Sequence, residues 1–295
     1  MASDRRPRGL FVGLATLDVI HRVERVPGSD EKVTALRQDV VAGGPAANAA
    51  VTFSALGGDA VLVSAVGDDP VGRMISAELA SHGVTVIDLA DAGHIASVSS
   101  VMVEDATGHR AVVGGDGGGA RIRQVNPAAA DAWLADIDVV LTDGHHPAIA
   151  EPVVARARVW DLPVVLDAGR WKPGMEAIAH AATDVVASEV FRWPGAGTSE
   201  ESAAAALDAG ARVAAYTSGA GPVRWWTAED AGEVRPPVVT AVDTLGAGDA
   251  FHGAYTFALA RGRGVAECVD DAARVAARRV AVIGPREWMR GLDRV

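Results

Sequence analysis

The sequence contains a single cysteine, Cys268, among its 295 residues. One cysteine cannot form an internal disulfide or a cysteine-rich metal site, and such sparing use of cysteine is typical of a reducing compartment. The apolar run at 10–17 is too short to cross a bilayer and is interrupted by Gly13. It also lacks the small-residue cleavage site of a secretory signal. We therefore expect a cytoplasmic protein.

Lysine and aromatic residues are also scarce. Lys32 and Lys172 are the only lysines among 27 basic residues, and neither follows the G-x-x-x-x-G pattern of a Walker-type loop. Any bound phosphate must therefore be held by backbone amides and arginines. The formal net charge of −11 argues against a nucleic acid as a partner. Because aromatic residues make up 5% of the chain and hydrophobic residues 49%, we expect an aliphatic core.

Strand-like and helix-like segments alternate along most of the chain. Short apolar strands are expected at 10–17, 61–66, 85–89, 139–142, 164–167, 185–187 and 213–217, with helices at 71–82, at 147–160 and after the capping box Thr198-x-x-Glu201. Strands that alternate with helices form parallel sheets through right-handed crossovers. The sequence therefore predicts a single α/β domain over 1–295, with a doubly wound, mainly parallel sheet flanked by helices.

Four short segments interrupt this alternation and carry no helix pattern. They lie at 19–26, 32–41, 97–104 and 110–114, and the last two are separated by the turn-like residues 105–108. We interpret them as a small β-sheet lid inserted from about 19–41 and 97–114; an extension of the main sheet is the alternative. Such a small sheet is not stable alone, so we expect it to pack against a second subunit in a homodimer.

A glycine-containing junction at 241–251 has the features of an anion site. It joins a β-branched run at 238–242, expected to be a strand, to a helix predicted by apolar residues at helical spacing. Gly246 and Gly248 let backbone N–H groups turn toward one point at the helix N-terminus, where the helix dipole favours a phosphoryl oxygen. Asp249 lies in the first turn of that helix.

Asp249 has two interpretations. A carboxylate beside an anion is repelled by it, so its presence favours a role in the reaction, and accepting the proton of an attacking hydroxyl is the obvious one. The alternative is an ordinary first-turn acid or N-cap, the commonest role of an Asp before a helix. The second interpretation explains the acid but neither glycine, and we favour the first.

Three further segments lie where an open α/β sheet binds ligands, at the carboxyl ends of strands. Asp18 follows the first strand, Asp143 follows a later one, and the glycine turn at 218–221 follows the last. The glycine turn could hold a nucleotide phosphate or be a plain β-turn. The adjacent histidines His145 and His146 do not define a metal site.

A second glycine pair precedes a buried helix. Gly43-Gly44-Pro45 places proline at the first helical position of a segment that is apolar nearly all round. Asn48 lies inside this helix, and an unsatisfied buried amide costs ~1–3 kcal/mol. A structural partner is the default for such an Asn. The adjacent glycines permit close approach of a ligand, however, so we favour contact with substrate hydroxyls.

With these residues in place, the chain resembles the PfkB (ribokinase-like) carbohydrate kinases over essentially its whole length. Two separated motifs carry the resemblance: Gly43-Gly44-Pro45-Ala46-Ala47-Asn48 together with Val66-Gly67-Asp68-Asp69-Pro70-Val71-Gly72, and Asp243-Thr244-Leu245-Gly246-Ala247-Gly248-Asp249. In motif detail the sequence is similar to the ketohexokinase and sulfofructose kinase branch, which suggests a ketose as acceptor. A nucleoside kinase of the same family and a catalytically silent sugar- or nucleotide-binding regulator are the alternatives.

The resemblance implies a ribokinase-like fold in which ATP donates a phosphoryl group to a sugar hydroxyl, with Asp249 as general base. It implies an anion hole at Gly246, Ala247 and Gly248, and substrate contacts from Asp18, Gly43, Gly44, Asn48, the lid residue Arg110 and Asp143. It implies nucleotide contacts from Ser188, Thr217, Gly219, Gly221, Asp243 and Thr244.

Three local features modify what the resemblance implies. The family's Asn-x-x-Glu should fall where Ser188 and Phe191 replace the Asn and the Glu, so we expect Mg²⁺ to be carried on the ATP phosphates and not by protein ligands. The segment 281–285 lacks the usual glycine-rich cation loop, and we expect no activation by a monovalent cation. After Asp143, residues 144–146 (Gly-His-His) supply no arginine for an anionic tail, which favours a neutral sugar.

Overall fold

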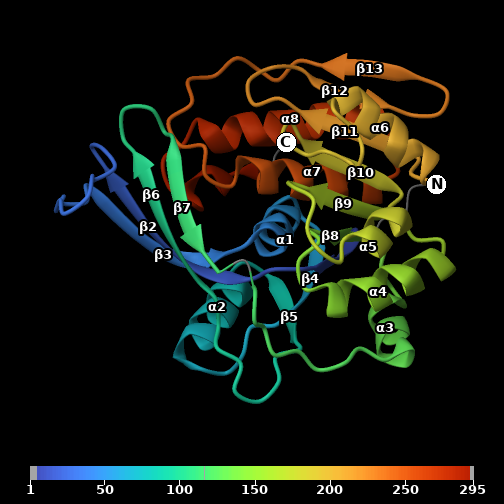
Figure 1. Cartoon of the computed structure of the whole chain (residues 1–295), viewed down its shortest axis with the longest axis horizontal. Coiled ribbons are helices and arrows are strands. Elements are labelled where there is room, and N and C mark those ends of the chain that lie inside the picture. The colour runs from blue at the N-terminus through green and yellow to red at the C-terminus, as the bar shows by residue number, and fades with distance from the viewer. Residues whose placement is uncertain (1–4, 116, 293–295) are drawn as a thin grey trace.

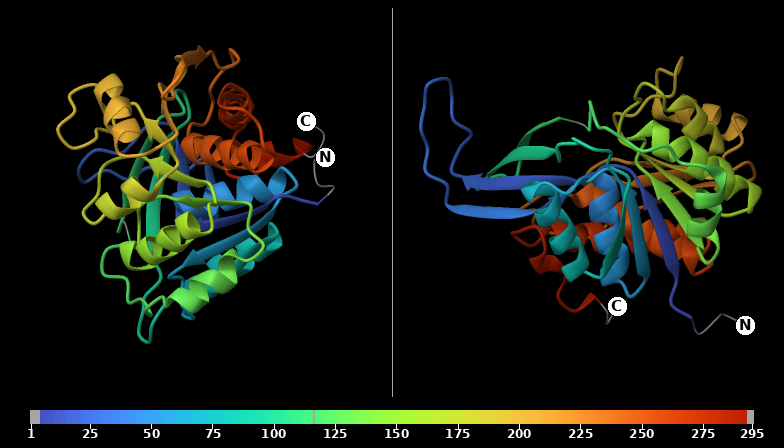
Figure 2. Two further views of the ribbon diagram at one scale, coloured as in Figure 1. Left: turned by 90° about the vertical axis from the view of Figure 1, so that its right-hand side faces the viewer. Right: turned by 90° about the horizontal axis from the view of Figure 1, so that it is seen from below.

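The computed structural model describes residues 5–115 and 117–292. Over these residues the chain forms a nine-stranded sheet with helices on both faces, together with a separate four-stranded sheet (Figure 1). Figure 2 shows the smaller sheet projecting from one end of the main body. The predicted α/β architecture with a small separate sheet is therefore confirmed.

The main sheet has the strand order β13-β12-β11-β10-β9-β8-β1-β4-β5. Its strands are β1 (Arg8–Val12), β4 (Asp59–Ser64), β5 (Val84–Asp88), β8 (Val139–Thr142), β9 (Val164–Ala168), β10 (Asp184–Ser188), β11 (Val213–Thr217), β12 (Val223–Trp226) and β13 (Ala231–Val234). The strands from β5 across to β11 are parallel, whereas β12 and β13 are antiparallel. Helices cover both faces of the parallel part, which explains the continuous apolar runs in the sequence.

Helices cover the two faces in two groups. One face is covered by α1 (Pro45–Ala55), α2 (Pro70–Ser81), α7 (Ala247–Ala260) and α8 (Val265–Val280), and the other by α3 (Pro127–Leu134), α4 (Pro147–Val159), α5 (Glu176–Ala181) and α6 (Ser199–Asp208). Successive side chains along a strand point to opposite faces of the sheet, so Phe11 packs with the first group of helices and Leu10 with the second. Helix α6 begins at the predicted capping box of Thr198 and Glu201. None of the described helices is long and apolar enough to cross a membrane.

Helices α1 and α7 lie in close contact near their N-termini. A Cβ on Gly253 of α7 would lie 2.5 Å from the carbonyl oxygen of Ala49 in α1. Because a real Cβ atom does not approach a backbone oxygen so closely, only glycine allows this spacing. The contact brings the first turn of α7 beside Asn48 of α1.

One predicted strand is divided between the two sheets. The strand expected at 10–17 breaks at Gly13: β1 ends before it, and β2 (Thr16–Val23) belongs to the smaller sheet. The carboxylate of Asp143 fills the space that a Cβ of Gly13 would take, and it accepts a hydrogen bond from the Leu14 amide at 2.9 Å. That amide is therefore not available to extend the β1 ladder.

The run at 238–242 is not a strand, contrary to the prediction. It belongs to the irregular segment that connects β13 to the start of α7, in which Val238 is fully exposed. The Val242 amide donates to the carbonyl oxygen of Val280 in α8 at 2.8 Å. β-branched residues form strands only where a neighbouring strand pairs with them, and none of the described strands pairs with this run.

The four-stranded sheet, called the lid below, has the order β3-β2-β6-β7, with β3 (Arg37–Gly43), β6 (Val98–Glu104) and β7 (Arg110–Gly114). Strand β2 pairs antiparallel with β3 and parallel with β6, and β6 pairs antiparallel with β7. The alternative of an extended main sheet is therefore wrong. Asp18, expected to follow a core strand, instead lies within β2 of the lid.

The lid contacts the segment that leads to α7. Arg22 in β2 donates from Nη2 to the carbonyl oxygen of Val242 at 3.0 Å, and Thr244 donates from Oγ1 to the carbonyl oxygen of Gly108 at 2.9 Å. A Cβ on Gly108, where φ is 66°, would lie 2.9 Å from backbone atoms of Val242. The turn between β6 and β7 is therefore seated directly on this segment.

Candidate active site

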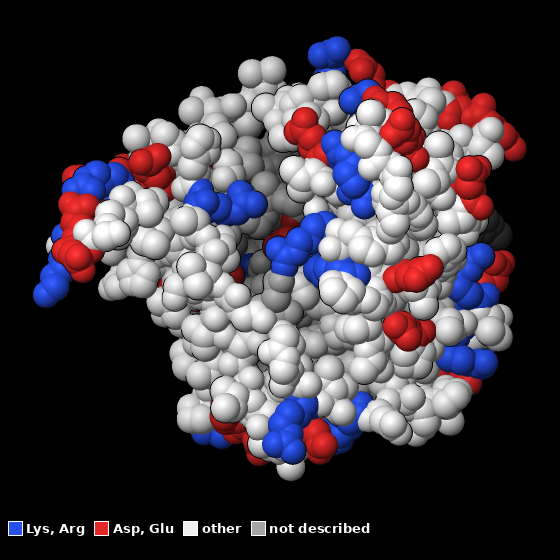
Figure 3. All heavy atoms as spheres, in the orientation of Figure 1, with Lys and Arg blue, Asp and Glu red and all other residues white. Residues whose placement is uncertain are grey.

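The candidate site forms where the N-termini of α1 and α7 meet below the lid. Figure 3 shows the molecule hollowed between the lid and the main body, with Lys and Arg side chains at the rim of the hollow. The carboxyl ends of the parallel strands open on this edge, and they carry Asp143, Asp167, Ser188 and Thr217. The structure thus brings residues from distant parts of the sequence to one edge of the sheet.

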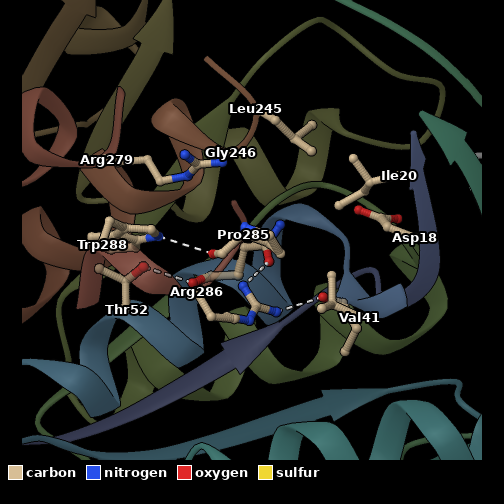
Figure 4. A pocket seen from close by; sticks show the side chains of 12 residues that line it. Asp18, Ile20, Val41, Thr52, Leu245, Gly246, Arg279, Pro285, Arg286 and Trp288 are labelled. Carbon is tan, nitrogen blue, oxygen red and sulfur yellow. Dashed lines mark hydrogen bonds between the residues drawn. The ribbon is translucent and has the colours of Figure 1, made fainter. Parts of the chain in front are cut away.

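A small cavity lies between the lid, α1 and the C-terminal part of the chain. It is lined by Asp18 and Ile20 of the lid, Asn48 and Thr52 of α1, Leu245 and Gly246, and Arg279, Arg286 and Trp288 (Figure 4). The two arginines had no role in the sequence prediction. They place positive charge directly behind the predicted anion site.

The segment before α7 has the geometry predicted for an anion site. Gly246 is the N-cap residue of α7 in the left-handed conformation (φ 69°), which favours glycine. The first N–H groups of a helix have no partner within the helix, so the amides of Gly248 and Asp249 face outward at the N-terminus. Apart from the adjacent residues and the backbone of α7 itself, no atom of the described residues lies within 4 Å of where a Cβ of Gly248 would stand. The turn therefore has outward-facing donors and open space beside them.

The Asp249 carboxylate lies in this first turn and is oriented by Asn48. Asn48 Nδ2 donates to Asp249 Oδ2 at 2.7 Å. The pKa of Asp249 is raised to about 6, first by burial and then by the charge of Asp167, while the hydrogen bond from Asn48 opposes the rise. Such a carboxylate is ionised at neutral pH but binds a proton more strongly than an exposed Asp.

Asn48 is itself fixed by Arg286. Arg286 Nη1 donates to Asn48 Oδ1 at 3.1 Å. Because a guanidinium can only donate, it holds the oxygen of the Asn48 amide toward itself and turns the amide nitrogen toward Asp249. Arg286 is anchored in turn by Glu78, 2.9 Å from Nε, and by the carbonyl oxygen of Ala42, 2.6 Å from Nη2. Asn48 thus has the structural partners that are the default for such an Asn, and its contact with substrate stays a prediction.

Asp167, at the end of β9, is a second carboxylate near Asp249 that sequence analysis did not identify. It is 7% exposed, and burial raises its pKa. His252 Nε2 lies 3.4 Å from Asp167 Oδ1 and 3.0 Å from the carbonyl oxygen of Val186, and His252 Nδ1 lies 2.7 Å from the carbonyl oxygen of Gly248. The imidazole therefore links the first turn of α7 to β9 and β10. The signal available in the sequence was the position of Asp167 at the end of a predicted strand.

Asp18 and the glycine pair come together as predicted for one site. A Cβ on Gly43 would lie 2.0 Å from Asp18 Oδ2, and a Cβ on Gly44, where φ is 95°, would lie 2.3 Å from the carbonyl oxygen of Leu14. The packing of protein atoms alone therefore requires both glycines. Asp18 Oδ1 accepts a hydrogen bond from Thr16 Oγ1 at 2.7 Å, and burial raises the pKa of Asp18.

Asp143 is engaged inside the protein. Its Oδ2 accepts from the amides of Leu14 at 2.9 Å and Ala46 at 3.1 Å, and its Oδ1 accepts from the amide of His145 at 2.8 Å. Burial acts to raise the pKa of Asp143, but His145, Lys172 and these hydrogen bonds hold it well below its usual range. These contacts favour a role in holding the β1–β2 connection against α1 over the substrate contact that the sequence suggested.

The lid arginine Arg110 reaches the segment before α7. Its Nη1 lies 3.2 Å from both the carbonyl oxygen and Oγ1 of Thr244. The neighbouring Asp243 is turned inward: its Oδ1 accepts from the amide of Leu245 at 3.1 Å and its Oδ2 from the amide of Gly284 at 3.1 Å. Asp243 therefore shapes the loop from within.

The remaining residues predicted to bind the nucleotide lie at the ends of neighbouring strands. Ser188 of β10 stands directly opposite Thr217 of β11. Gly219 (φ 54°) and Gly221 belong to the turn after β11, in which the Gly221 amide donates to the carbonyl oxygen of Ser218 at 2.7 Å. The structure thus gathers these four residues at the carboxyl edge of the sheet.

The positions expected to carry the Asn and Glu of Asn-x-x-Glu make contacts inside the protein. Ser188 donates from Oγ to the carbonyl oxygen of Gly169 at 2.8 Å. Phe191 is buried between Trp171 and Tyr216, with ring centroids 6.0 and 6.5 Å from its own. Across residues 5–115 and 117–292, no group of three or more His, Cys, Asp or Glu side chains is placed to hold a metal ion. These two positions offer no carboxylate to a magnesium ion.

The sequence matches a known protein family and several characterised kinases. The family model described as pfkB family carbohydrate kinase matches residues 8–289. The chain is 32% identical over 257 residues to the ATP-dependent ribose-1-phosphate kinase of Halopiger xanaduensis, covering 83% of this chain and 82% of that protein. It is 26% identical over 289 residues to the ribokinase of Bacillus subtilis, covering 94% of each.

A solved structure shows the same fold. The ribokinase of Arabidopsis thaliana, complexed with ribose and ATP, matches with a TM-score of 0.78 and 21% identity, covering 99% of this chain and 100% of that chain. These relatives are ribokinases and a ribose-1-phosphate kinase, so they give no support to the predicted closeness to ketohexokinases. The residues matched by the family model include the sheet, the lid and both glycine motifs. The chain therefore belongs to the pfkB family of carbohydrate kinases.

Proposed function

We propose that the protein transfers the γ-phosphoryl group of ATP to a hydroxyl of a ribose-like sugar, with Asp249 as the general base. The observation that carries the proposal is the presence, in one turn of α7, of a basic carboxylate and an open helix N-terminus. The names of the relatives, ribokinase and ATP-dependent ribose-1-phosphate kinase, support the donor and the class of acceptor.

Asp249 takes the proton of the acceptor hydroxyl as the hydroxyl oxygen attacks the γ-phosphorus. The new oxygen–phosphorus bond forms while the bond to the bridging oxygen breaks, and ADP leaves with the electron pair of that bond. A pKa of about 6 keeps the carboxylate ionised at neutral pH and strongly basic for a carboxylate. The Asn48 amide orients Asp249, and Arg286 orients the amide.

The turn formed by Gly246, Ala247 and Gly248 stabilises the charge of the transferred group. Its outward-facing amides and the dipole of α7 complement negative oxygens that develop in the transition state. Arg110 adds a guanidinium from the lid, held beside this turn at Thr244. Mg²⁺ neutralises the charge of the phosphates when it is bound, and the ATP phosphates are its ligands in this proposal.

The remaining residues bind and position the two substrates in this proposal. Asp18, Asn48 and the backbone at Gly43 and Gly44 contact the sugar, and Ser188, Thr217, Gly219 and Gly221 line the nucleotide. Asp243, Thr244 and Asp143 act as positioning residues, because their contacts hold the two helix N-termini in place.

A coupled assay of ADP formation tests the proposal with ribose, ribose-1-phosphate, fructose and adenosine as acceptors. We expect kcat/KM for ribose to exceed that for fructose at least ~10-fold, a difference of about 1.4 kcal/mol in transition-state binding. Because residues 144–146 provide no arginine, we also expect ribose to exceed ribose-1-phosphate. Adenosine as the best acceptor would identify a nucleoside kinase. ATP binding without turnover of any acceptor would identify a silent regulator.

The pH dependence of turnover follows from the pKa of Asp249. Only the ionised carboxylate accepts a proton, so kcat/KM should fall as the pH decreases through about 6. The charge of Asp167 contributes to the raised pKa, so Asp167→Asn should lower the pKa of Asp249 and move the acid limb to lower pH. Profiles of kcat/KM against pH measure this shift. Asp131→Asn, which removes a carboxylate paired with Arg156 on α4, is the matched control. An acid limb that stays in place in Asp167→Asn would contradict the assignment of the base.

We propose that the outer face of the lid forms a homodimer. Side chains alternate along β2, so Asp18 and Ile20 face the cavity while Val19 faces outward beside Val40 of β3. Val40 is 50% exposed, and Val113, on the same outer face in β7, is 70% exposed. An exposed face of a small sheet that carries such valines is stable when a second copy covers it.

Sedimentation velocity at micromolar concentration measures the oligomeric state. We expect a species of twice the 30.2 kDa chain mass. Val40→Glu should convert it to a monomer, whereas Val159→Glu, at an exposed valine of α4, should not. A 30.2 kDa species for the unmodified chain would contradict the proposed dimer.

A further inference from the structure

Arg279 is a buried guanidinium directly behind the anion-binding turn. It lies near the end of α8 and is 2% exposed. Its Nη2 lies 3.3 Å from Asp243 Oδ2, and its Nη1 donates to the carbonyl oxygens of Asp243 at 3.4 Å and Val282 at 3.2 Å. In Figure 4 the Arg279 side chain points toward the segment that carries Leu245 and Gly246. One cation thus ties α8 and the C-terminal segment to the loop that leads into α7.

The burial of this cation calls for an explanation beyond stability. Removing a charge from water is costly, and a buried ion pair is often no more stabilising than apolar residues of the same volume. Asp243 is the partner that joins the pair to the site, because its Oδ1 also accepts from the amide of Leu245, next to Gly246. The pair therefore fixes the backbone whose amides face the transferred phosphoryl group in the proposed function.

The groups around the guanidinium are those that a small metal cation takes. They comprise a carboxylate oxygen of Asp243 and the backbone carbonyl oxygens of Asp243 and Val282, all of them oxygen donors. Hard cations prefer carboxylate and carbonyl oxygens. In this chain the positive charge among these oxygen atoms is the guanidinium of Arg279.

We propose that Arg279 is a built-in cation that holds the anion-binding turn in its active shape, so that turnover requires no monovalent metal ion. Arg279 is a positioning residue in this proposal, since it acts through Asp243 and the turn at Gly246. The inference rests on the proposed function, because it assigns the turn to the transferred phosphoryl group.

The first test uses the unmodified protein. ADP formation with its best acceptor is measured in a buffer of tetramethylammonium salt, at an ionic strength of about 0.1 M, and in the same buffer with the salt replaced by KCl. We expect kcat to differ by less than about 2-fold between the two buffers, because the guanidinium already supplies the charge. Stimulation by K⁺ of about 10-fold or more would overturn the proposal.

The second test removes the guanidinium. Arg279→Ala leaves the oxygen groups of Asp243 and Val282 without their cation, so we expect kcat to fall at least ~10-fold with a small change in the KM for sugar. Added K⁺ or guanidinium chloride should restore kcat in a saturable manner. Arg274→Ala removes an exposed arginine of the same helix, paired with Asp270, and should respond to neither ion. Full kcat for Arg279→Ala without any added cation would overturn the proposal.

Two further measurements distinguish a failure of the proposed function from a failure of the proposal for Arg279. The thermal midpoint of Arg279→Ala should rise with K⁺ and that of the unmodified protein should not, which tests the cation site without any turnover. A chain that turns over no acceptor would refute the proposed function, while the midpoints would still decide whether Arg279 replaces a cation. Should Arg279→Ala fail to fold, Arg279→Lys keeps a positive charge at the site. It should retain K⁺-independent turnover, and a K⁺ requirement in that variant would count against the proposal.

Discussion

Replacing Asp249 with Asn should slow the chemical step by roughly 10²–10⁴-fold while leaving the fold intact. The amide of the new residue has nearly the size of the carboxylate, and its oxygen can still accept the hydrogen bond from Asn48. It has no basic lone pair for the proton of the acceptor hydroxyl. ATP should bind equally well or slightly better, since a negative charge near the γ-phosphate is gone. Single-turnover rates measure the chemical step, and the thermal midpoint measures the stability of the fold.

The control for Asp249→Asn is another acid in the first turn of a helix. Glu267 in α8 accepts a hydrogen bond from the amide of Gly264 at 3.1 Å and pairs with Arg263 at 2.7 Å, and both contacts are structural. Glu267→Gln should lose up to about 1 kcal/mol of stability and keep its full kcat. The same pattern for Asp249→Asn, with turnover within a few-fold of the unmodified protein, would show that Asp249 is structural. The base would then lie elsewhere, with Asp167 as the next candidate.

Local sequence patterns predicted the main sheet well because its strands are buried on both sides and are separated by helices. The strands at 139–142 and 213–217 were predicted at their observed bounds. The prediction was wrong where a distant residue decides the outcome. The strand expected at 10–17 ends early because Asp143 accepts the hydrogen bond of the Leu14 amide, and none of the described strands pairs with the run at 238–242. Neither effect leaves a trace in the local sequence.

The candidate site divides in the same way. The left-handed turn at Gly246 was visible in the sequence, since it demands glycine. Close approach at Gly43 was also predicted, but the approaching group is Asp18 and not the expected ligand. Arg286 and Arg279 were not visible, because each acts on a segment far away in the chain. An arginine near a C-terminus carries no local sign that it orients Asn48 or pairs with Asp243. Such contacts depend on the packing of α8 and the C-terminal segment against α1 and α7.

Gly248 provides the second test of the anion-binding turn, through the substitution Gly248→Ala. Apart from the adjacent residues and the backbone of α7 itself, no atom of the described residues lies within 4 Å of the added methyl group. The residue is within the regular helix α7, where Ala is favoured over Gly by about 0.5–1 kcal/mol. The protein should therefore fold at least as stably. The methyl group would occupy the open space assigned to the transferred phosphoryl group. A displacement of about 1 Å there should reduce kcat by about 10²-fold, and the measurement pairs kcat with the thermal midpoint.

Gly253→Ala, five residues further along α7, is the matched control. We expect it to lower stability and to leave turnover largely unchanged. Its methyl group would meet the carbonyl oxygen of Ala49 at 2.5 Å, so α1 and α7 must separate. We expect a loss of about 1–3 kcal/mol in the free energy of unfolding, with kcat per folded molecule largely kept. Together the two variants separate a glycine needed for packing from one needed for a ligand. If Gly248→Ala turned over within a few-fold of the unmodified protein, the space beside Gly248 would not be the phosphoryl site, and the anion hole would have to lie elsewhere.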